Sequence, residues 1–329
     1  MEPVEPLESH VLFAGNDAAG TFEVGTIDPS DGHYVPTHKG TGFGPGWTHV
    51  VAVGPHVLSV RNDADGTFEV GHIDQSTGQY VQTESSTGFF APSNHVVAVG
   101  PYVLSVRKNG WYEVGHIDQS SATYVPDHTG PSFGWGWTHV VAVGPHFLLV
   151  RNLPVLPAGT GDFAVRHIDQ STAAGYVETH SGTFSNHWTH VVAVGPHVLF
   201  VSAPTGQFEV GHIDESFATY VPTQKDTVFT DSNHVVAACS RVFLSRHDQF
   251  VVGHIDQSTV QFVKTDNPGP GVGGTPDPIY VVAVGPHVLG VSPTKELGYV
   301  MHFNHTGQVV ETQSGPPFAS DWAHVVAVA

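Results

Sequence analysis

Charged side chains are scarce in this sequence, and cations are the scarcest. Asp, Glu, Lys and Arg make up 12% of the 329 residues, about half the quarter that is usual in soluble proteins. Lys and Arg number 11 against 30 Asp and Glu, so the formal net charge is −19 with histidine neutral. Because binding to nucleic-acid phosphates needs clustered Lys and Arg, this composition argues against a nucleic-acid partner.

The sequence also lacks cysteine pairs and long apolar runs. The single cysteine, Cys239, cannot form an intrachain disulfide and is expected to be a small buried apolar residue. No run of about 18 apolar residues is present, which argues against a membrane-spanning helix. The segment Met1 to Leu7 is acidic and contains proline, unlike a secretory signal peptide. We therefore expect a soluble protein, either cytoplasmic or released by a non-classical route, with no membrane insertion.

The residues that are abundant indicate a folded β protein. The chain has too many Val, Phe and Tyr residues for a disordered acidic chain, and it lacks the Glu, Lys and Leu content of a coiled coil. Histidine is the unusual residue, because its 24 copies are more than twice the 11 Lys and Arg together.

An internal repeat explains much of this composition. The phrase His-Val-Val-Ala-Val-Gly or a close variant begins at His49, His95, His139, His190, His234, Tyr280 and His324. Successive copies start 46, 44, 51, 44, 46 and 44 residues apart. Each unit contains short strand patterns separated by turn residues, as in His49–Val53, Val57–Arg61, Thr67–Ile73 and Gln79–Thr83. Such a period is typical of propeller blades.

The two ends of the chain divide one repeat between them. The last unit is followed by a single first strand, His324 to Ala329, whereas the N-terminus begins inside a unit, because Ser9-His10-Val-Leu matches Pro55-His56-Val-Leu. In a closed ring, the C-terminal strand can complete the blade that the N-terminal strands begin. Closure also removes exposed sheet edges. No polar capping repeat of a solenoid is found.

We therefore predict one all-β domain over residues 1–329, a seven-bladed β-propeller of four-stranded antiparallel blades in which the C-terminal strand completes the N-terminal blade. The predicted units are 324–329 with 9–48, 49–94, 95–138, 139–189, 190–233, 234–279 and 280–323.

Recurrent histidines and aspartates are the first candidate residues. In the phrase His-Ile-Asp, strand alternation places the His and the Asp on one face, and the Asp would accept amide hydrogens in the following turn, a structural role. A second His follows the Gly-Pro turn, and the expected register places His56 opposite His72. Alternatively, two His and one Asp would bind a divalent ion such as Zn²⁺. The possible sets are His56/His72/Asp74, His146/His167/Asp169 and His197/His212/Asp214.

Aromatic and cationic residues form the second group of candidates. If Val53 pairs with Val57, Arg61 lies opposite His49 and Trp47 lies just beyond, so that Trp, His and Arg gather on one rim. A Trp ring beside hydrogen-bond donors suits glycans, whereas packing of the Trp between blades and pairing of the Arg with a loop are the structural alternatives. The candidate ligand-binding residues are Trp47, Trp137, Trp188, Trp322, His49, His139, His190, His324, Arg61, Arg107, Arg151 and Arg246.

No catalytic motif is found among the repeats. G-x-S-x-G, H-E-x-x-H, P-loop and C-x-x-C patterns are absent. The longest unit, His139 to Thr189, contains an insertion at Leu153 to Gly159 that carries no catalytic group. Because the polar positions repeat from blade to blade, they favour several equivalent weak sites over one catalytic constellation. We expect a protein that is not an enzyme and needs no cofactor.

Three phrases carry a resemblance to a known family: Gly46-Trp-Thr-His-Val-Val, Leu58-Ser-Val-Arg-Asn and Gly66-Thr-Phe-Glu-Val-Gly-His-Ile-Asp. With these the chain resembles the β-propeller lectins of mushrooms and bacteria, and more loosely the tachylectin and tectonin groups. The resemblance implies sugar sites between or on the blades. It predicts a multivalent lectin with glycans or glycoproteins as partners, and it implies a role as a defensive hemagglutinin. The alternatives are a protein-interaction or storage propeller and a histidine-based metal binder.

Overall fold

The computed structural model describes most of the chain. The described residues are 10–15, 17–28, 30–131, 133–153, 160–184, 187–227, 232, 234–246, 249–265, 280–292, 297–303, 309–315 and 322–328. No helix among them is long and apolar enough to cross a membrane.

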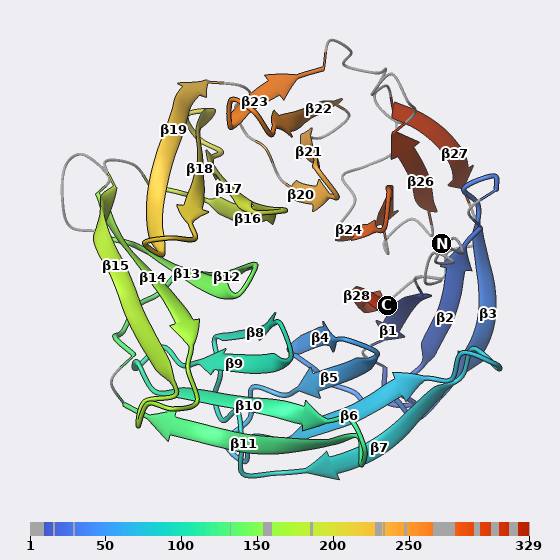
Figure 1. The fold of residues 1–329 in the computed structure, drawn as a ribbon. Coiled ribbons are helices and arrows are strands. Elements are labelled where there is room, and N and C mark those ends of the chain that lie inside the picture. Colours follow the sequence, from blue (N-terminus) through green and yellow to red (C-terminus); the bar gives the residue numbers. More distant parts are fainter. Residues whose placement is uncertain are drawn as a thin grey trace, which may run out of the picture. The chain divides into compact units, whose positions relative to one another are not determined.

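The predicted fold is confirmed, because the chain forms seven four-stranded antiparallel sheets, the blades of a β-propeller (Figure 1). The last strand joins the sheet of the first three strands and closes the propeller, with Val326 opposite Leu12. Two compact units can be distinguished, Met1–Gly88 with Asp118–Thr123 and Pro278–Ala329, and Phe89–Ile117 with Tyr124–Asp277. The single domain expected over residues 1–329 stays a prediction.

The first unit holds three blades. Blade 1 is β28 (Trp322–Val328), β1 (His10–Gly15), β2 (Phe22–Ile27) and β3 (Tyr34–Gly40). Blade 2 is β4 (His49–Val53), β5 (His56–Val60), β6 (Phe68–Ile73) and β7 (Tyr80–Ser86). Blade 7 is β24 (Tyr280–Val284), β25 (His287–Ser292), β26 (Leu297–Phe303) and β27 (Val309–Gly315).

The second unit holds the other four blades. Blade 3 is β8 (His95–Val99), β9 (Tyr102–Val106), β10 (Tyr112–Asp118) and β11 (Thr123–Gly130), its β10–β11 turn being counted with the first unit. Blade 4 is β12 (His139–Val143), β13 (His146–Asn152), β14 (Gly161–Ile168) and β15 (Tyr176–Phe184). Blade 5 is β16 (His190–Val194), β17 (His197–Ser202), β18 (Gln207–Asp214) and β19 (Thr219–Thr227). Blade 6 is β20 (His234–Ala238), β21 (Arg241–Arg246), β22 (Gln249–Asp256) and β23 (Gln261–Lys264).

The hairpin from the first to the second strand is one residue tighter than predicted. Val53 pairs with His56, so His49 lies opposite Val60 and not opposite Arg61. The cause is a two-residue turn in which Gly54 has a φ of 58°, a conformation that glycine adopts without strain. In blade 6, Cys239 takes this turn position with a φ of 55° and is exposed, so the expectation of a buried cysteine is wrong. The predicted pairing of His56 with His72 is confirmed.

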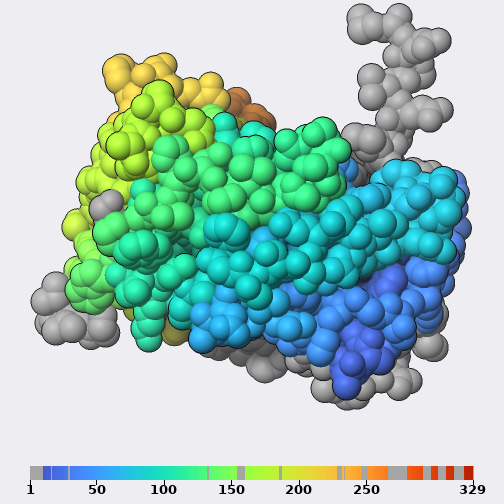
Figure 2. All heavy atoms as spheres, turned by 90° about the horizontal axis from the view of Figure 1, so that it is seen from below, coloured from blue at the N-terminus to red at the C-terminus, as the bar shows by residue number. Residues whose placement is uncertain are grey.

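Apolar side chains pack between neighbouring blades of each unit. In the first unit, Leu12 and Val24 of blade 1 share a core with Val57 and Ile73 of blade 2. Figure 2 shows the atoms of residues 10–40, in blue, directly against those of residues 49–86, in lighter blue and cyan. Burial of both faces of the inner strands accounts for the low charge content, since few strand positions remain for charged side chains.

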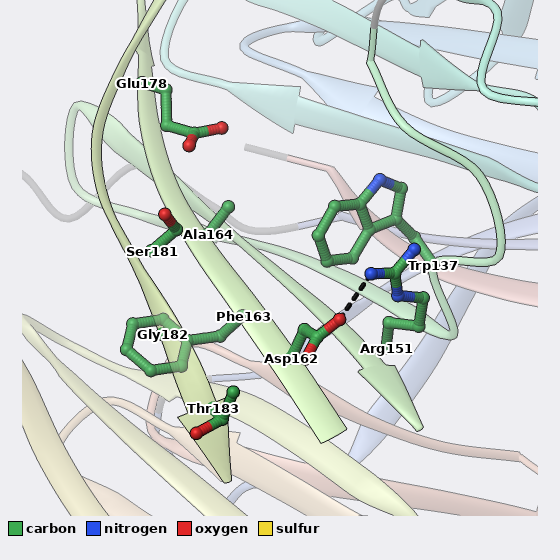
Figure 3. Close-up of a pocket in the computed structure, with 9 residues that line it drawn as sticks. All are labelled: Trp137, Arg151, Asp162, Phe163, Ala164, Glu178, Ser181, Gly182 and Thr183. Atoms are coloured by element: carbon green, nitrogen blue, oxygen red, sulfur yellow. Dashed lines mark hydrogen bonds and ion pairs between the residues drawn. The ribbon is translucent and has the colours of Figure 1, made fainter. Parts of the chain in front are cut away.

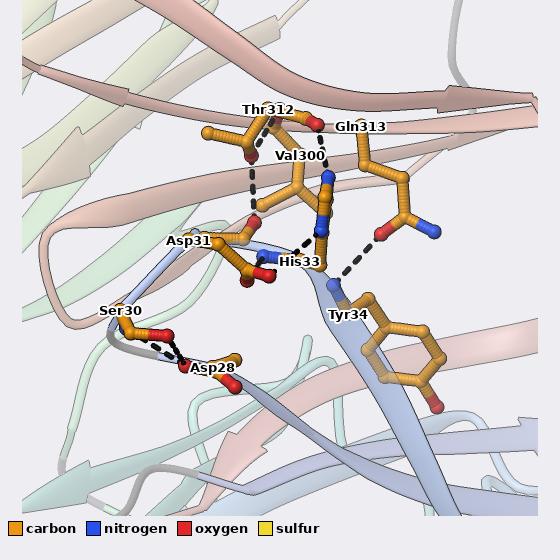
Figure 4. Close-up of polar contacts among 9 residues, drawn as sticks. Asp28, Ser30, Asp31, His33, Tyr34, Val300, Thr312 and Gln313 are labelled. Carbon is orange, nitrogen blue, oxygen red and sulfur yellow. Dashed lines mark hydrogen bonds and ion pairs between the residues drawn. The ribbon is translucent and has the colours of Figure 1, made fainter.

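Polar contacts join the outer strands of adjacent blades. In the first unit, Thr312 Oγ1 donates to Gly32 O at 2.6 Å, and Tyr34 N donates to Gln313 Oε1 at 2.7 Å (Figure 4). In the second unit, Thr179 Oγ1 donates to Ala218 O at 2.6 Å. The outer-strand threonine of one blade thus binds the turn of the next blade, and this contact occurs in both compact units.

A buried tyrosine–glutamate hydrogen bond, which the sequence analysis missed, recurs in four blades. The tyrosine is the first or second residue of the outer strand, and its hydroxyl donates to a glutamate on the third strand. The pairs are Tyr34 to Glu23 at 2.8 Å, Tyr80 to Glu69 at 2.8 Å, Tyr124 to Glu113 at 2.9 Å and Tyr220 to Glu209 at 2.8 Å. The four glutamates are 1–4% exposed. A glycine two residues after each glutamate makes room for the ring, because a Cβ on Gly71 would lie 2.4 Å from Tyr80 Cζ.

The surroundings of the four glutamates differ in charge. Lys39 Nζ lies 2.6 Å from Glu23, and Lys225 Nζ lies 2.7 Å from Glu209. Glu69 lies opposite Ser85 in the sheet. Burial raises the pKa of the Glu69 carboxyl to about 7, against the lowering effect of the Tyr80 hydroxyl.

Replacing Glu69 with Gln is expected to remove the loss of stability that this carboxyl causes as the pH rises. Because the pKa of Glu69 is raised to about 7 on folding, its stabilising contribution is complete below the ordinary carboxyl range and is lost as the pH rises through about 7. The melting temperature of the wild type relative to that of Glu69→Gln should therefore fall from pH 5 to pH 8, because the histidines titrate alike in both proteins. Glu209→Gln is the control, since it breaks the Lys225 ion pair and should lower the melting temperature at both pH values. Parallel curves for wild type and Glu69→Gln would contradict this assignment.

Candidate functional site

A cleft of about 390 Å³ lies on blade 4, over the paired strands β14 and β15 and beside the loop that precedes β12 (Figure 3). Its lining residues are Trp137, Arg151, Asp162, Phe163, Ala164, Glu178, Ser181, Gly182 and Thr183. Asp162, Ala164 and Arg166 alternate along one face of β14. Ala164, which pairs with Ser181 of β15, therefore lies midway between two charged side chains.

Each end of the cleft carries an arginine–carboxylate pair. Arg151 Nη2 donates to Asp162 Oδ2, and both side chains are about a quarter exposed. Arg166 Nη2 and Nε both donate to Glu178 Oε2, at 2.7 and 3.0 Å. The Arg166 side chain is 7% exposed and that of Glu178 is 42% exposed, so the cation is buried and the carboxylate reaches solvent.

Aromatic rings hold both guanidinium groups. The Arg166 guanidinium carbon lies 4.4 Å from the Phe133 ring centroid and 4.7 Å from that of Tyr176, and Nη1 donates to Phe133 O at 3.1 Å. The Arg151 guanidinium carbon lies 5.2 Å from the Trp137 centroid. Cation–π contacts of this kind orient the guanidinium while leaving the carboxylate partners accessible.

Blade 4 departs from the repeat at the positions that form the cleft. Ala164 stands where blade 2 has Glu69, and Arg166 stands where blade 2 has Gly71. Asp162 and Glu178 replace Thr67 and Gln82 of blade 2. The short Ala164 side chain leaves the floor of the cleft open, and the arginine introduces a buried cation. Blade 4 keeps the recurrent polar positions of the repeat, but these four changes make it unlike blade 2 at the cleft.

The four candidate tryptophans divide into one cleft residue and three core residues. Trp47, Trp188 and Trp322 are 6, 1 and 7% exposed, which favours packing between blades over stacking on a ligand. Trp137 is half-buried and borders the cleft, with Nε1 donating to Phe133 O at 3.0 Å. The Phe of this loop, which precedes the Trp by four residues, is buried.

The candidate histidines of the inner strands contact backbone oxygens of the next blade or the hydroxyl of the preceding threonine. His139 Nε2 lies 3.1 Å from Thr189 O, and His324 Nε2 lies 2.7 Å from Trp47 O. Nδ1 of His49 and of His190 each lies 3.0 Å from the preceding threonine hydroxyl. Burial lowers the pKa of His139 and His324, as expected for neutral imidazoles that connect neighbouring segments.

Two of the candidate arginines contact tryptophan rings. The Arg61 guanidinium carbon lies 4.5 Å from the Trp47 centroid, the counterpart of Arg151 over Trp137. The backbone N–H of Arg107 donates to Trp111 O at 2.8 Å. The side chain of Arg246 lies outside the described residues.

The predicted metal sets are formed only in part. His56, His146 and His197 pair with His72, His167 and His212, with ring centroids 6.3, 5.9 and 6.4 Å apart. The aspartates point elsewhere, because Asp74, Asp169 and Asp214 accept the amide hydrogens of Ser76, Ser171 and Ser216 at 2.8, 2.9 and 2.8 Å. Within the described part of the chain, no three such side chains come together. The turn role expected of the aspartates is confirmed.

Comparisons with known proteins found matches among solved structures alone. No family model matches the chain, and no curated protein matches it. A candidate 6-phosphogluconolactonase from Bacteroides fragilis matches with a TM-score of 0.68 at 12% identity over 100% of both chains. Another, from Bacteroides uniformis, matches at 0.69 and 15%, over 98% of this chain and 99% of that one. The periplasmic gluconolactonase of Pseudomonas aeruginosa matches at 0.66 and 14%, with the same coverage.

These comparisons support the propeller fold and correct two expectations from the sequence. The lectin prediction is wrong, because these structural neighbours are lactonase-like propellers and not lectins. The prediction of a non-enzymatic protein is wrong for the same reason. That prediction assumed that the blades are equivalent. Blade 4 is not, because Ala164 and Arg166 replace the glutamate and glycine of the repeat there. At 12–15% identity the likeness shows the fold.

The double variant Ala164→Glu/Arg166→Gly is expected to restore the regular blade. Arg166→Gly alone removes a packed side chain from a strand and should lower the free energy of unfolding by about 2–4 kcal/mol. In the double variant the introduced glutamate can accept a hydrogen bond from the Tyr176 hydroxyl. At least half of the lost free energy of unfolding should therefore be regained. Chemical denaturation of both single variants and the double variant measures this coupling. Additive losses would show that the two positions are independent.

Proposed function

We propose that the protein is a hydrolase of small polyhydroxylated lactones, with its active site in the blade 4 cleft. The observation that carries the proposal is the departure of blade 4 from the repeat, which places Asp162, Glu178, Arg151 and Trp137 around an open floor, with Arg166 paired to Glu178. The lactonase-like structural neighbours support the choice of reaction.

The dimensions of the cleft suit one sugar-sized ring. Asp162 and Arg166 are four residues apart on β14, so their Cα atoms are separated by about 13 Å. Between them, the Trp137 ring offers an aromatic face to the C–H groups of a sugar. Ser181 and Thr183 line the cleft from the adjacent strand β15 and offer hydroxyl groups to the substrate. The cleft therefore combines an apolar face with several hydrogen-bonding groups, as small-molecule sites usually do.

Glu178 is the proposed general base. Both bonds from Arg166 go to Oε2, and among the described residues none donates to Oε1. Oε1 would take a proton from a water as that water attacks the lactone carbonyl carbon, and the proton would pass to the ring oxygen as the C–O bond breaks. The Ser181 hydroxyl, in the middle of the cleft, would donate to the carbonyl oxygen as negative charge develops there. Arg166 is a positioning residue, since it holds the carboxylate in place.

Glu178→Gln is expected to lower kcat for D-glucono-1,5-lactone by about 10²- to 10⁴-fold, because the amide cannot take the proton from water. Acid release above the spontaneous rate measures this loss. Glu311→Gln is the matched control, since Glu311 occupies the same position in blade 7 but lies opposite Met301. Activity no greater than in buffer for the wild type would refute the proposed function. Equal activities for the two variants would refute the role of Glu178.

A further inference from the structure

Trp135, next to the cleft, is an exposed large aromatic residue that packing does not explain. It is 69% exposed, whereas Trp137, two residues later, is half-buried against the cleft. Arg151 connects the two, because its guanidinium carbon lies 5.6 Å from the Trp135 centroid and 5.2 Å from the Trp137 centroid. Arg151 Nη1 also donates to Trp135 O at 3.0 Å. The exposed ring is therefore continuous with the lining of the cleft through one shared cation.

The loop that presents Trp135 is held by hydrogen bonds on both sides of the ring. Phe133 N donates to Gly110 O at 3.1 Å, and Gly136 N donates to Lys108 O at 3.3 Å. Gly134 and Gly136 have φ values of 87° and 78°, a conformation that glycine accepts readily. An exposed ring on an anchored loop loses little conformational entropy when a ligand stacks on it.

The repeat provides an internal comparison in the loop that precedes β4. There Gly44-Pro45-Gly46-Trp47 corresponds to Gly134-Trp135-Gly136-Trp137. The glycines have the same backbone conformation, with φ values of 74° and 81°. Pro45 therefore shows that the loop and its arginine–tryptophan contact form without a second tryptophan. Trp135 is an addition to blade 4, the blade whose cleft also departs from the repeat.

We propose that Trp135 is a second subsite, which stacks on a further pyranose ring attached to the lactone in the cleft. The inference rests on the proposed lactone hydrolase and narrows its substrates to aldonolactones of disaccharides. A pyranose has a face of C–H groups for the indole ring and hydroxyl oxygens that can accept from Arg151. The lactone ring would lie over Ala164 and beside Trp137, and the second ring would extend over Trp135.

Trp135→Pro tests the subsite, because Pro45 stands at the same place in an equivalent loop. The variant should lower kcat/KM for cellobiono-1,5-lactone by about five- to tenfold, which is the worth of one stacked ring, and should change kcat/KM for D-glucono-1,5-lactone by less than about twofold. Phe217→Ala is the control, since Phe217 is 75% exposed in the turn between β18 and β19 and should change neither value. Equal losses for both lactones, or no preference of the wild type for the longer one, would overturn the subsite.

Equilibrium binding separates this inference from the proposed function. Cellobionate and gluconate differ by the second ring and require no catalysis. Quenching of tryptophan fluorescence should show tighter binding of cellobionate by the wild type, and Trp135→Pro should abolish that difference. If neither lactone is hydrolysed, the proposed function fails, while a cellobionate preference that depends on Trp135 still supports the subsite. If both lactones are hydrolysed and the two acids bind equally well, the subsite alone fails.

Discussion

The hydrogen bond from a buried tyrosine to a buried glutamate is the contact on which the regular blades depend. It connects the third and fourth strands at a place where the glutamate is 1–4% exposed, so the carboxylate requires the tyrosine as a donor. Blade 6 shows this dependence, because both partners are replaced together, the glutamate by Val251 and the tyrosine by Phe262. Neither a carboxylate nor a hydroxyl is then left without its partner. The glycine below the ring follows from the same contact, since any side chain there would meet the aromatic ring.

Blade 4 keeps the tyrosine but gives up the glutamate and the glycine. Arg166 fills the space of the glycine and stacks on Tyr176, and its charge is balanced from the next strand by Glu178. A buried cation costs desolvation that an apolar replacement would avoid. The desolvation cost of Arg166 occurs beside the cleft, in the blade that also carries the exposed Trp135. This location is consistent with the proposal that the cleft binds a ligand through charged groups. Blade 4 therefore differs from the regular blades in charge as well as in packing.

Much of the fold followed from the sequence because it depends on turns and alternation. The Gly-Pro turns and the spacing of the repeat predicted the blades and the opposition of His56 and His72. The first hairpin was placed one residue too long, since the length of a turn is poorly determined by its residue types. The Tyr80–Glu69 bond was not predicted, because Glu69 resembles an exposed residue of an alternating strand. The changes at Ala164 and Arg166 were visible in the sequence, but nothing there showed that they share one face of a cleft with Trp137.

The pairing of β28 with β1 has a consequence for how the protein is made. Contacts in the closing region join residues as far apart as Gly32 and Thr312, which are separated by 280 positions. A ribosome adds about 5–20 residues per second, so the interval between the two strands is on the order of tens of seconds. Throughout that time, the innermost position of blade 1 is empty, and β1 presents an unpaired edge to other chains. Protection of that edge during synthesis is therefore a requirement that the closed architecture places on the cell.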